Sequence, residues 1–295
     1  MQQTGGPEVL RLVEAARPEP GDGEVLVRVR AAAINPIDWK YRRGLMPKQL
    51  PAVLGSDISG VVESSRSERF ATGDEVFGLA ASGGYAEFAV SSAALLAPKP
   101  AGLAHEQAAA LPVAGMTAWQ ALFDVGELRS GQSVLIAGAA GGVGHLAVQF
   151  ARVAGVQAIG TASARNREFV LGLGAARFID YAGEELAGVH GEVDVAFDTV
   201  GGATTETLLD TLRPGGMIVT IAGGAPEQAA AERGVRAQLL VMSPDAEELG
   251  RIGGLVAAGE VEVEIAQVMA LADVAEAHAL SESGHTRGKI VLSLD

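Results

Sequence analysis

The sequence predicts an α/β protein of two domains, an all-β, barrel-like unit and a parallel, doubly wound sheet with helices on both faces. Two observations lead to this prediction. The first hundred residues contain short strand-like stretches separated by glycines, whereas residues 133–258 alternate between strand-like and helix-like stretches. The chain has 295 residues, which exceeds the ~250 residues at which a single hydrophobic core stops growing.

The first hundred residues carry the alternating pattern of half-buried strands. Valines recur at every second position from Val25 and Val27 onward, and similar strand-like stretches cover residues 53–62, 75–78 and 85–90. Glycines and a proline separate these stretches, as expected for tight turns. We therefore predict short strands and turns here, without a helix.

Domain boundaries follow from composition and from the tail of the chain. The proline-containing stretch 98–102 ends the β-rich part. We expect residues 1–100 to form the first domain and residues 101–265 the second. Residues 288–294 are again strand-like, and we expect this strand to return to the first domain, so that residues 266–295 complete it.

In the second domain, strands and helices alternate after a helical segment at residues 105–125. The predicted strands are Ser133–Ala137, Gln157–Thr161, Arg177–Tyr181, Val193–Thr199, Met217–Ala222 and Gln238–Met242. The predicted helices are Gly142–Ala154, Arg165–Leu173, Ala203–Leu212 and Pro244–Ala258. Continuous apolar runs such as Val193–Phe197 are typical of a parallel sheet that is buried on both faces.

A glycine-rich turn links the first of these strands to its helix. Gly138, Gly141 and Gly144 allow a tight turn and a close approach of the backbone to a diphosphate. The N–H groups and the positive dipole end of the following helix then face that anion. An ordinary turn of small residues is the alternative, because Gly and Ala are abundant throughout this chain.

Composition excludes several classes of partner. The formal net charge is −14, so the surface repels nucleic acid and anionic membranes. No run of about 18 apolar residues predicts a membrane span. The N-terminus shows no basic segment followed by an apolar one, so we see no signal peptide and expect a cytoplasmic protein.

The chain also lacks the usual ligands of zinc. It contains no cysteine, and its five histidines show no His-x-x-x-His spacing. We therefore expect no metal site and interpret the histidines as structural or solvent-exposed.

Four segments together resemble a known family. They are Gly5–Leu10, Ala33–Lys40, Leu111–Ala118 and Ala139–Gly144. The chain resembles the zinc-independent, quinone-oxidoreductase-like branch of the medium-chain dehydrogenase/reductase superfamily. This resemblance covers nearly the whole chain and implies a GroES-like β domain joined to a Rossmann domain, with NADPH in the cleft between them.

The positions that match the family's zinc ligands carry other residues here. Asn35 replaces the catalytic cysteine, and Gly55-Ser56-Asp57 replaces the Gly-His-Glu segment. The resemblance therefore implies hydride transfer without a metal.

The end of the second Rossmann strand indicates which cofactor binds. An NAD enzyme would carry Asp or Glu there to hold the ribose hydroxyls, but the sequence has Ser163 followed by Arg165 and Arg167. A hydroxyl and a guanidinium suit a 2′-phosphate, so we expect NADPH rather than NADH. Ser163 could alternatively cap the next helix, and one of the two arginines could simply be solvated.

The predicted cofactor-binding set combines this strand end with positions that the resemblance implies. Those positions are Thr117 and the ends of two further strands. The set is Thr117, Ala140, Gly141, Gly142, Val143, Ser163, Arg165, Asn166, Val200, Ala222 and Gly223. The alternatives are a hydroxyl of Thr117 bonded to its own helix and ordinary turns at the strand ends.

The predicted catalytic set is Asn35, Lys40 and Tyr41. Asn35 would contact the substrate carbonyl or the nicotinamide ribose, and Lys40 or Tyr41 would donate a proton or hold the ribose. A solvated lysine and a packing tyrosine are the alternatives. We expect Asp38 to order its loop through backbone hydrogen bonds.

The leading hypothesis is therefore an NADPH-dependent reductase of a small hydrophobic quinone or α,β-unsaturated carbonyl. The alternatives are an NADP(H)-dependent alcohol or aldehyde oxidoreductase and a non-catalytic NADPH-binding redox sensor. The resemblance also implies a homodimer that pairs the apolar strand 238–242 with its copy, because an exposed apolar edge strand is otherwise a liability.

Overall fold

The computed structural model describes residues 1–183 and 186–294, which divide into two compact units. Unit 1 comprises residues 1–116, 244–259 and 263–295, and unit 2 comprises residues 117–243 and 260–262. None of the helices in the described part of the chain is long and apolar enough to cross a bilayer.

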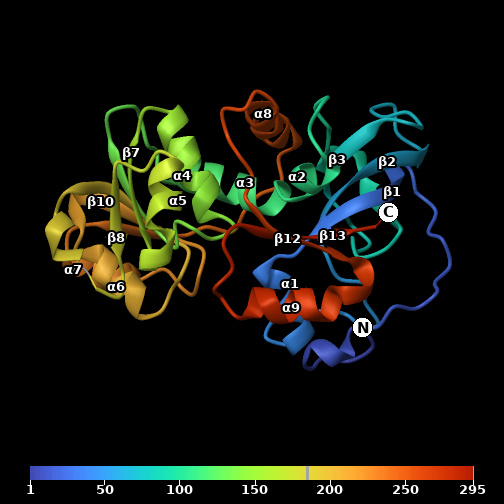
Figure 1. Cartoon of the computed structure of the whole chain (residues 1–295), viewed down its shortest axis with the longest axis horizontal. Helices are drawn as coiled ribbons and strands as arrows, with labels where there is room; N and C mark the ends of the chain where they lie inside the picture. Colours follow the sequence, from blue (N-terminus) through green and yellow to red (C-terminus); the bar gives the residue numbers. More distant parts are fainter. Residues whose placement is uncertain (184–185, 295) are drawn as a thin grey trace. The chain divides into compact units, whose positions relative to one another are not determined.

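Unit 1 is built on a seven-stranded sheet with the order β12-β13-β1-β2-β3-β5, in which β4 also pairs with β1 (Figure 1). The strands are β1 (Glu24–Ala33), β2 (Asp57–Ser65), β3 (Glu75–Leu79), β4 (Phe88–Ser92), β5 (Leu96–Pro98), β12 (Ile265–Ala270) and β13 (Lys289–Ser293). The tail strand β13 runs antiparallel to β1, with Ala31 opposite Ser293. Buried Val, Ile and Leu side chains from β1, β2 and β13 share one core.

Among the described residues, five α-helices belong wholly or mainly to unit 1. They are α1 (Pro36–Arg43), α2 (His105–Ala109), α3 (Pro112–Trp119), which continues into unit 2, α8 (Ala246–Ala257) and α9 (Val274–Glu282). The prediction of a first hundred residues without a helix is wrong at α1. Pro36 stands at its first position, Asp38 accepts from the backbone N–H of Asn35, and Gly44 ends it with φ +74°. These are ordinary start and stop signals of a helix.

Unit 2 contains a six-stranded parallel sheet with the order β11-β10-β9-β6-β7-β8. The strands are β6 (Ser133–Ala137), β7 (Gln157–Ala162), β8 (Arg177–Asp180), β9 (Val193–Asp198), β10 (Leu212–Thr220) and β11 (Arg236–Leu239). The helices between them are α4 (Gly144–Val153), α5 (Arg167–Gly172), α6 (Ala203–Leu209) and α7 (Glu227–Glu232). In chain order this is the 3-2-1-4-5-6 arrangement of the Rossmann fold, which confirms the predicted doubly wound sheet.

The last strand of unit 2 differs from its predicted bounds. β11 begins at Arg236 and ends at Leu239, not at Met242. Its sole neighbour among the described strands is β10, which ends at Thr220 opposite Leu239. The backbone of Leu240 donates once more to Thr220 O; residues 241–243 belong to none of the described strands.

Candidate functional site

The strands of unit 2 end at one level, and this brings several predicted cofactor residues to one edge of the sheet. Ala137 of β6 lies opposite Thr161 of β7 and Asp198 of β9, and Asp198 lies opposite Thr220 of β10. The turns that follow β6, β7, β9 and β10 therefore emerge side by side. The chain order reverses between β6 and β9, and ligands of such sheets bind at this reversal, outside the carboxyl ends of the strands.

The glycine-rich turn after β6 has the geometry that the sequence predicts. Gly138 has φ +73°, and a Cβ on it would lie 2.4 Å from Thr199 Oγ1. A Cβ on Gly144 would lie 2.2 Å from the carbonyl oxygen of Gly138. Both positions therefore require glycine, because any side chain would push the turn apart.

The backbone of this turn has hydrogen-bond donors to offer. The N–H of Gly141 donates to the Gly138 carbonyl inside the turn. In contrast, the N–H groups of Ala140, Gly142 and Val143 donate to no backbone carbonyl of the described residues. These donors precede the N-terminus of α4, so the turn suits an anionic diphosphate.

After β7, a serine and an asparagine are held against each other. Asn166 Nδ2 donates to Ser163 Oγ at 3.1 Å, and the Asn166 N–H donates to the Ser163 carbonyl at 2.8 Å. Ser163 precedes the short helical turn Ala164–Asn166, but its side chain makes no cap hydrogen bond. Arg165 follows directly. The end of β7 is thus followed by a serine and an exposed arginine, with no acidic residue among residues 157–167, and this suits a phosphate better than a ribose hydroxyl.

Asp198, which the sequence analysis did not select as a site residue, organises the turn after β9. Its side chain is fully buried, and Oδ1 accepts from the N–H groups of Val200 and Gly201, both at 2.9 Å. Oδ2 accepts from the hydroxyl of Thr205 at 2.5 Å. The carboxylate therefore fixes a turn whose predicted contact residue, Val200, is 54% exposed. An acidic residue at the end of an otherwise apolar strand was the available signal.

The remaining predicted cofactor residues lie in the turn after β10 and on α3. Ala222 donates its N–H to Thr220 Oγ1 at 3.1 Å, and Gly223 follows with φ +95° and open space around its Cα. Thr117 is 6% exposed on α3. With their open glycine and free turn amides, the described residues of this edge fit a dinucleotide.

In unit 1, Asn35 lies in a buried polar network rather than on an open surface. Asn35 Nδ2 donates to Asp57 Oδ2 at 2.9 Å, and Asn35 Oδ1 accepts from Lys289 Nζ at 2.5 Å. Asp38 Oδ2 accepts from the backbone N–H of Asn35 at 2.9 Å and from the hydroxyl of Tyr85 at 2.8 Å. Asp38 thus makes a backbone hydrogen bond, as the sequence predicts, but as part of the capping box of α1 and not of a loop.

Burial shifts the protonation of this network. It raises the pKa of the Asp57 carboxyl to about 7, although the Lys289 ammonium 3.9 Å away opposes the shift. Burial also raises the pKa of Asp38 and lowers the pKa of Lys289. Sequence analysis did not assign Lys289 or Tyr85 to a site, since they lie far from Asn35 in the chain.

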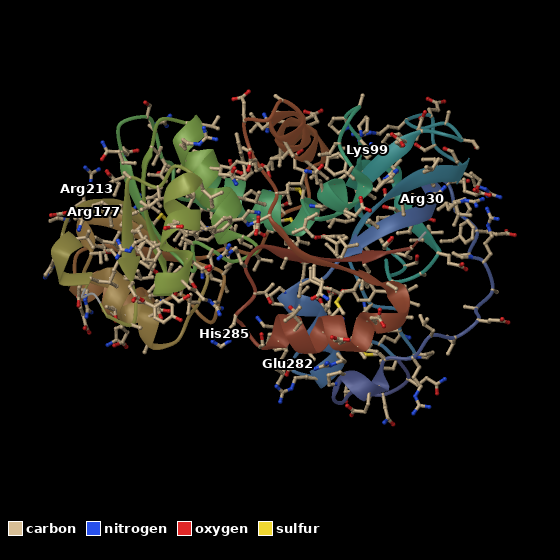
Figure 2. All side chains as sticks on the ribbon, in the orientation of Figure 1. Arg30, Lys99, Arg177, Arg213, Glu282 and His285 are labelled. Atoms are coloured by element: carbon tan, nitrogen blue, oxygen red, sulfur yellow. The ribbon has the colours of Figure 1, made fainter. Side chains whose placement is uncertain are left out.

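Lys40 and Tyr41 are not part of the network. Lys40 Nζ lies 5.8 Å from the centre of the Trp39 ring, and Tyr41 packs against the core of unit 1 with Lys48 Nζ 5.2 Å from its ring. Arg42 and Arg43, which also lie on α1, form ion pairs with Glu282 of α9. Figure 2 labels Glu282. The structure thus brings together Asn35, Asp38, Asp57, Tyr85 and Lys289.

The residues of this network do not fit a zinc centre. The chain has no cysteine, and Asn35 Oδ1 already accepts from an ammonium group. The Asp57 oxygens accept from Asn35 and from the Val113 N–H, at 3.2 Å in the latter case. Across residues 1–183 and 186–294 no group of three His, Asp or Glu side chains could hold a metal ion.

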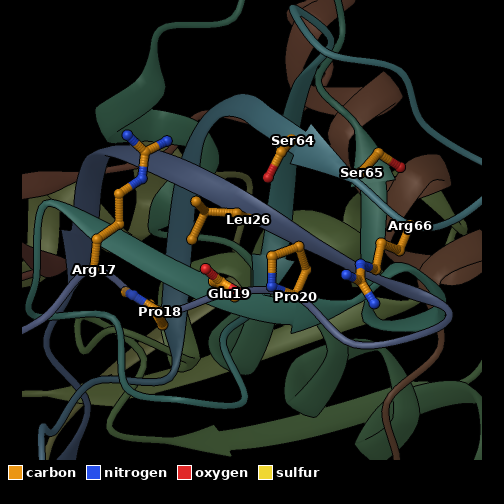
Figure 3. A pocket seen from close by; sticks show the side chains of 8 residues that line it. All are labelled: Arg17, Pro18, Glu19, Pro20, Leu26, Ser64, Ser65 and Arg66. Carbon is orange, nitrogen blue, oxygen red and sulfur yellow. The ribbon is translucent and has the colours of Figure 1, made fainter.

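A separate groove of about 520 Å³ lies on unit 1, and Figure 3 shows its walls. Leu26, Ser64 and Arg66 line it together with the segment Arg17–Pro20. Its two arginines pair with carboxylates, Arg17 with Glu63 and Arg66 with Asp22. The groove contains none of the predicted site residues, and we assign it no role in the chemistry.

Comparison with known proteins identifies the family. Residues 21–101 match the alcohol dehydrogenase GroES-like domain, and residues 173–292 match a model described as zinc-binding dehydrogenase. A quinone oxidoreductase of Pseudomonas aeruginosa is 37% identical over 98% of this chain and 96% of its own length.

Solved structures agree with this assignment. The quinone oxidoreductase of Coxiella burnetii has a TM-score of 0.94 at 37% identity, covering 100% of this chain and 98% of that one. The Escherichia coli quinone oxidoreductase complexed with NADPH has a TM-score of 0.91 at 31% identity, covering 99% and 98%. The chain belongs to the quinone-oxidoreductase-like branch of the medium-chain dehydrogenase/reductase superfamily.

Proposed function

We propose that the protein is an NADPH-dependent oxidoreductase that reduces a quinone to a hydroquinone. NADPH, when bound, supplies a hydride, and the quinone takes up this hydride and one proton. The observation that carries the proposal is the edge of the unit 2 sheet at which β6, β7 and β9 end side by side. There the N–H groups of the turn after β6 donate to no backbone carbonyl of the described residues, and the end of β7 carries no acidic residue. The full-length similarity to quinone oxidoreductases supports the same reaction.

Each predicted residue has a defined task in this proposal. The N–H groups of Ala140, Gly142 and Val143 hold the diphosphate, while Ser163 and Arg165 face the 2′-phosphate. The other predicted members of the set, Thr117, Gly141, Asn166, Val200, Ala222 and Gly223, complete the walls of the cofactor site.

The substrate needs a hydrogen-bond donor where negative charge develops. We assign this task to the amide of Asn35, because a carbonyl oxygen that gains charge is stabilised by a fixed N–H group. Lys40 and Tyr41 stay candidates for proton donation or ribose contact. An α,β-unsaturated carbonyl meets the same requirement as a quinone and is the second substrate class that we propose.

The first test is NADPH oxidation, followed by its absorbance, with several acceptors. The panel is 1,4-benzoquinone, 9,10-phenanthrenequinone, a 2-alkenal and a simple ketone, with NADH in place of NADPH and EDTA as controls. EDTA-resistant turnover of a quinone or the alkenal that prefers NADPH supports the proposal. Turnover of the simple ketone alone would favour an alcohol or aldehyde oxidoreductase, and NADPH binding without any turnover would favour a redox sensor.

We also propose a homodimer that forms along β11. β10 is the sole partner of β11 among the described strands. Leu239 at the end of β11 is 41% exposed, and Val241, just beyond the strand, is 81% exposed. An exposed strand edge with apolar residues beside it pairs readily with a second copy. Light scattering of the wild type and of Val241→Glu checks this proposal: we expect a dimer that the substitution weakens, and a monomeric wild type would contradict it.

A further inference from the structure

The cation in the buried network of unit 1 comes from a strand far from the other members in the chain. Lys289 begins β13, and its side chain is 4% exposed. Its ammonium donates to the Ile34 carbonyl at 3.1 Å and to Asn35 Oδ1 at 2.5 Å. β13 pairs with β1 at Val291–Ser293, and Lys289 itself lies opposite Ile265 of β12.

An asparagine amide has two orientations that differ only by exchange of its oxygen and nitrogen, so its partners decide which one is present. An ammonium group is a donor without acceptor capacity, and Lys289 therefore requires Asn35 Oδ1 to face it. Asp57 is less decisive, because a carboxyl with a pKa of about 7 is both donor and acceptor near neutral pH.

We propose that Lys289 is a positioning residue for quinone reduction, because it fixes the Asn35 amide with its N–H groups directed away from the ammonium. One N–H then goes to Asp57 and the second is left for the substrate oxygen. This inference rests on the proposed function, in which Asn35 contacts that oxygen. In the flipped orientation, the amide would present its own oxygen and repel the developing negative charge.

The charges around Asp57 predict how the loss of Lys289 would change the pKa of Asp57 and the orientation of the Asn35 amide. Lys289 faces it from β13 and Asp38 from α1, while Asn35 and the Val113 N–H donate to its oxygens. Without the ammonium, two carboxyls share a buried site with no cation, so the pKa of Asp57 rises above about 7. A protonated Asp57 does not require a donor, and the amide is then free to flip.

The test compares Lys289→Met with Lys99→Met as a matched control. Lys99 is a second buried lysine of unit 1, labelled in Figure 2, whose Nζ donates to Leu103 O at 2.6 Å and pairs with Glu75. Steady-state kinetics with a quinone, NADPH binding by fluorescence and circular dichroism are measured on both variants and on the wild type.

We expect Lys289→Met to lower kcat about 10–100-fold at pH 7, as the loss of an orienting partner does elsewhere, with the NADPH Kd unchanged. Its kcat rises toward the wild-type value at alkaline pH, where an ionised Asp57 again requires the amide N–H. A merely structural role predicts no such recovery. Lys99→Met keeps the wild-type kcat and pH profile.

A second variant covers the possibility that Lys289→Met does not fold. Lys289→Gln retains a donor that reaches the same oxygens, but it is uncharged and can also accept, so its kcat at pH 7 should lie between those of Lys289→Met and the wild type. Wild-type kcat in a folded Lys289→Met at every pH would overturn the inference, as would a folded Lys289→Gln without measurable turnover. A wild-type enzyme that fails to oxidise NADPH with any quinone would instead overturn the proposed function.

Discussion

Truncation of Asp198 to alanine tests whether one buried carboxylate holds the turn that follows β9. The substitution removes three hydrogen bonds, from the N–H groups of Val200 and Gly201 and from the Thr205 hydroxyl. Hydrogen bonds to charged groups contribute about 1.5–3 kcal/mol each. Water reaches the exposed turn and compensates part of this loss, so we expect unfolding to become easier by about 3–5 kcal/mol.

The assay is urea unfolding, followed by circular dichroism, together with NADPH binding by fluorescence. Thr205→Val removes one of the three hydrogen bonds and should lower the free energy of unfolding by about 1–2 kcal/mol. Asp198→Asn keeps an acceptor oxygen for the turn and a donor for Thr205 Oγ1. Its free energy of unfolding should therefore lie between those of Asp198→Ala and Thr205→Val. We expect NADPH affinity to fall in the same order, by about tenfold for each 1.4 kcal/mol lost in positioning the turn.

A free energy of unfolding for Asp198→Ala within about 1 kcal/mol of the wild-type value would contradict this role of the carboxylate. So would a greater loss of stability in Thr205→Val, since that variant leaves two of the three hydrogen bonds in place. Loss of stability with unchanged NADPH affinity would show that the turn does not contact the cofactor.

Three further predictions concern other positions. Gly138→Ala places a Cβ 2.4 Å from Thr199 Oγ1 at φ +73°, and the displaced turn should raise the NADPH Kd at least about tenfold in a fluorescence titration; an unchanged Kd would contradict this. Burial lowers the pKa of His278 to about 4, below its usual 6.5, so the unfolded chain binds the extra proton and stability falls as pH decreases from about 6.5 to 4. Urea midpoints of His278→Phe should lack this component of the wild-type pH dependence, and parallel curves would refute the assignment. Glu282→Gln removes the carboxylate that pairs with the buried Arg42 guanidinium and should lower the free energy of unfolding by about 3 kcal/mol, whereas Arg43→Ala, on the exposed side of the same carboxylate, should change it by less than about 1 kcal/mol.

Local patterns in the sequence were enough to predict the sheet of unit 2 and its glycine-rich turn. The strand Ser133–Ala137 has the predicted bounds, because a turn before this apolar run and a glycine after it define where the strand begins and ends. Helix α1 was missed, although Pro36 and Gly44 bracket it, because it is only eight residues long and lies between two stretches that predict strands. The predicted domain boundaries after residues 100 and 265 stay predictions.

The polar network of unit 1 shows what local patterns cannot supply. Asn35 and Asp38 are close in the chain and were both selected from the sequence. Lys289 lies 254 residues from Asn35, and a lysine in a tail strand reads as an exposed residue. This lysine is buried because β13 pairs with β1 and, at Lys289 itself, with β12, and strand pairing at such separation is a property of the tertiary fold. The tasks assigned to Asn35, Lys40 and Tyr41 stay predictions.

The discontinuous path of unit 1 also sets an order for synthesis on the ribosome. All of unit 2 has been made once residue 262 is translated. In contrast, Asn35 cannot form its hydrogen bond with Lys289 until residue 289 has been synthesised. The middle of the chain can therefore fold before the beginning does, a reversal of the usual order in which N-terminal domains fold first. Until β13 arrives, residues 31–33 of β1 lack the partner strand on the side that β13 occupies, and an unpaired edge of this kind is open to aggregation.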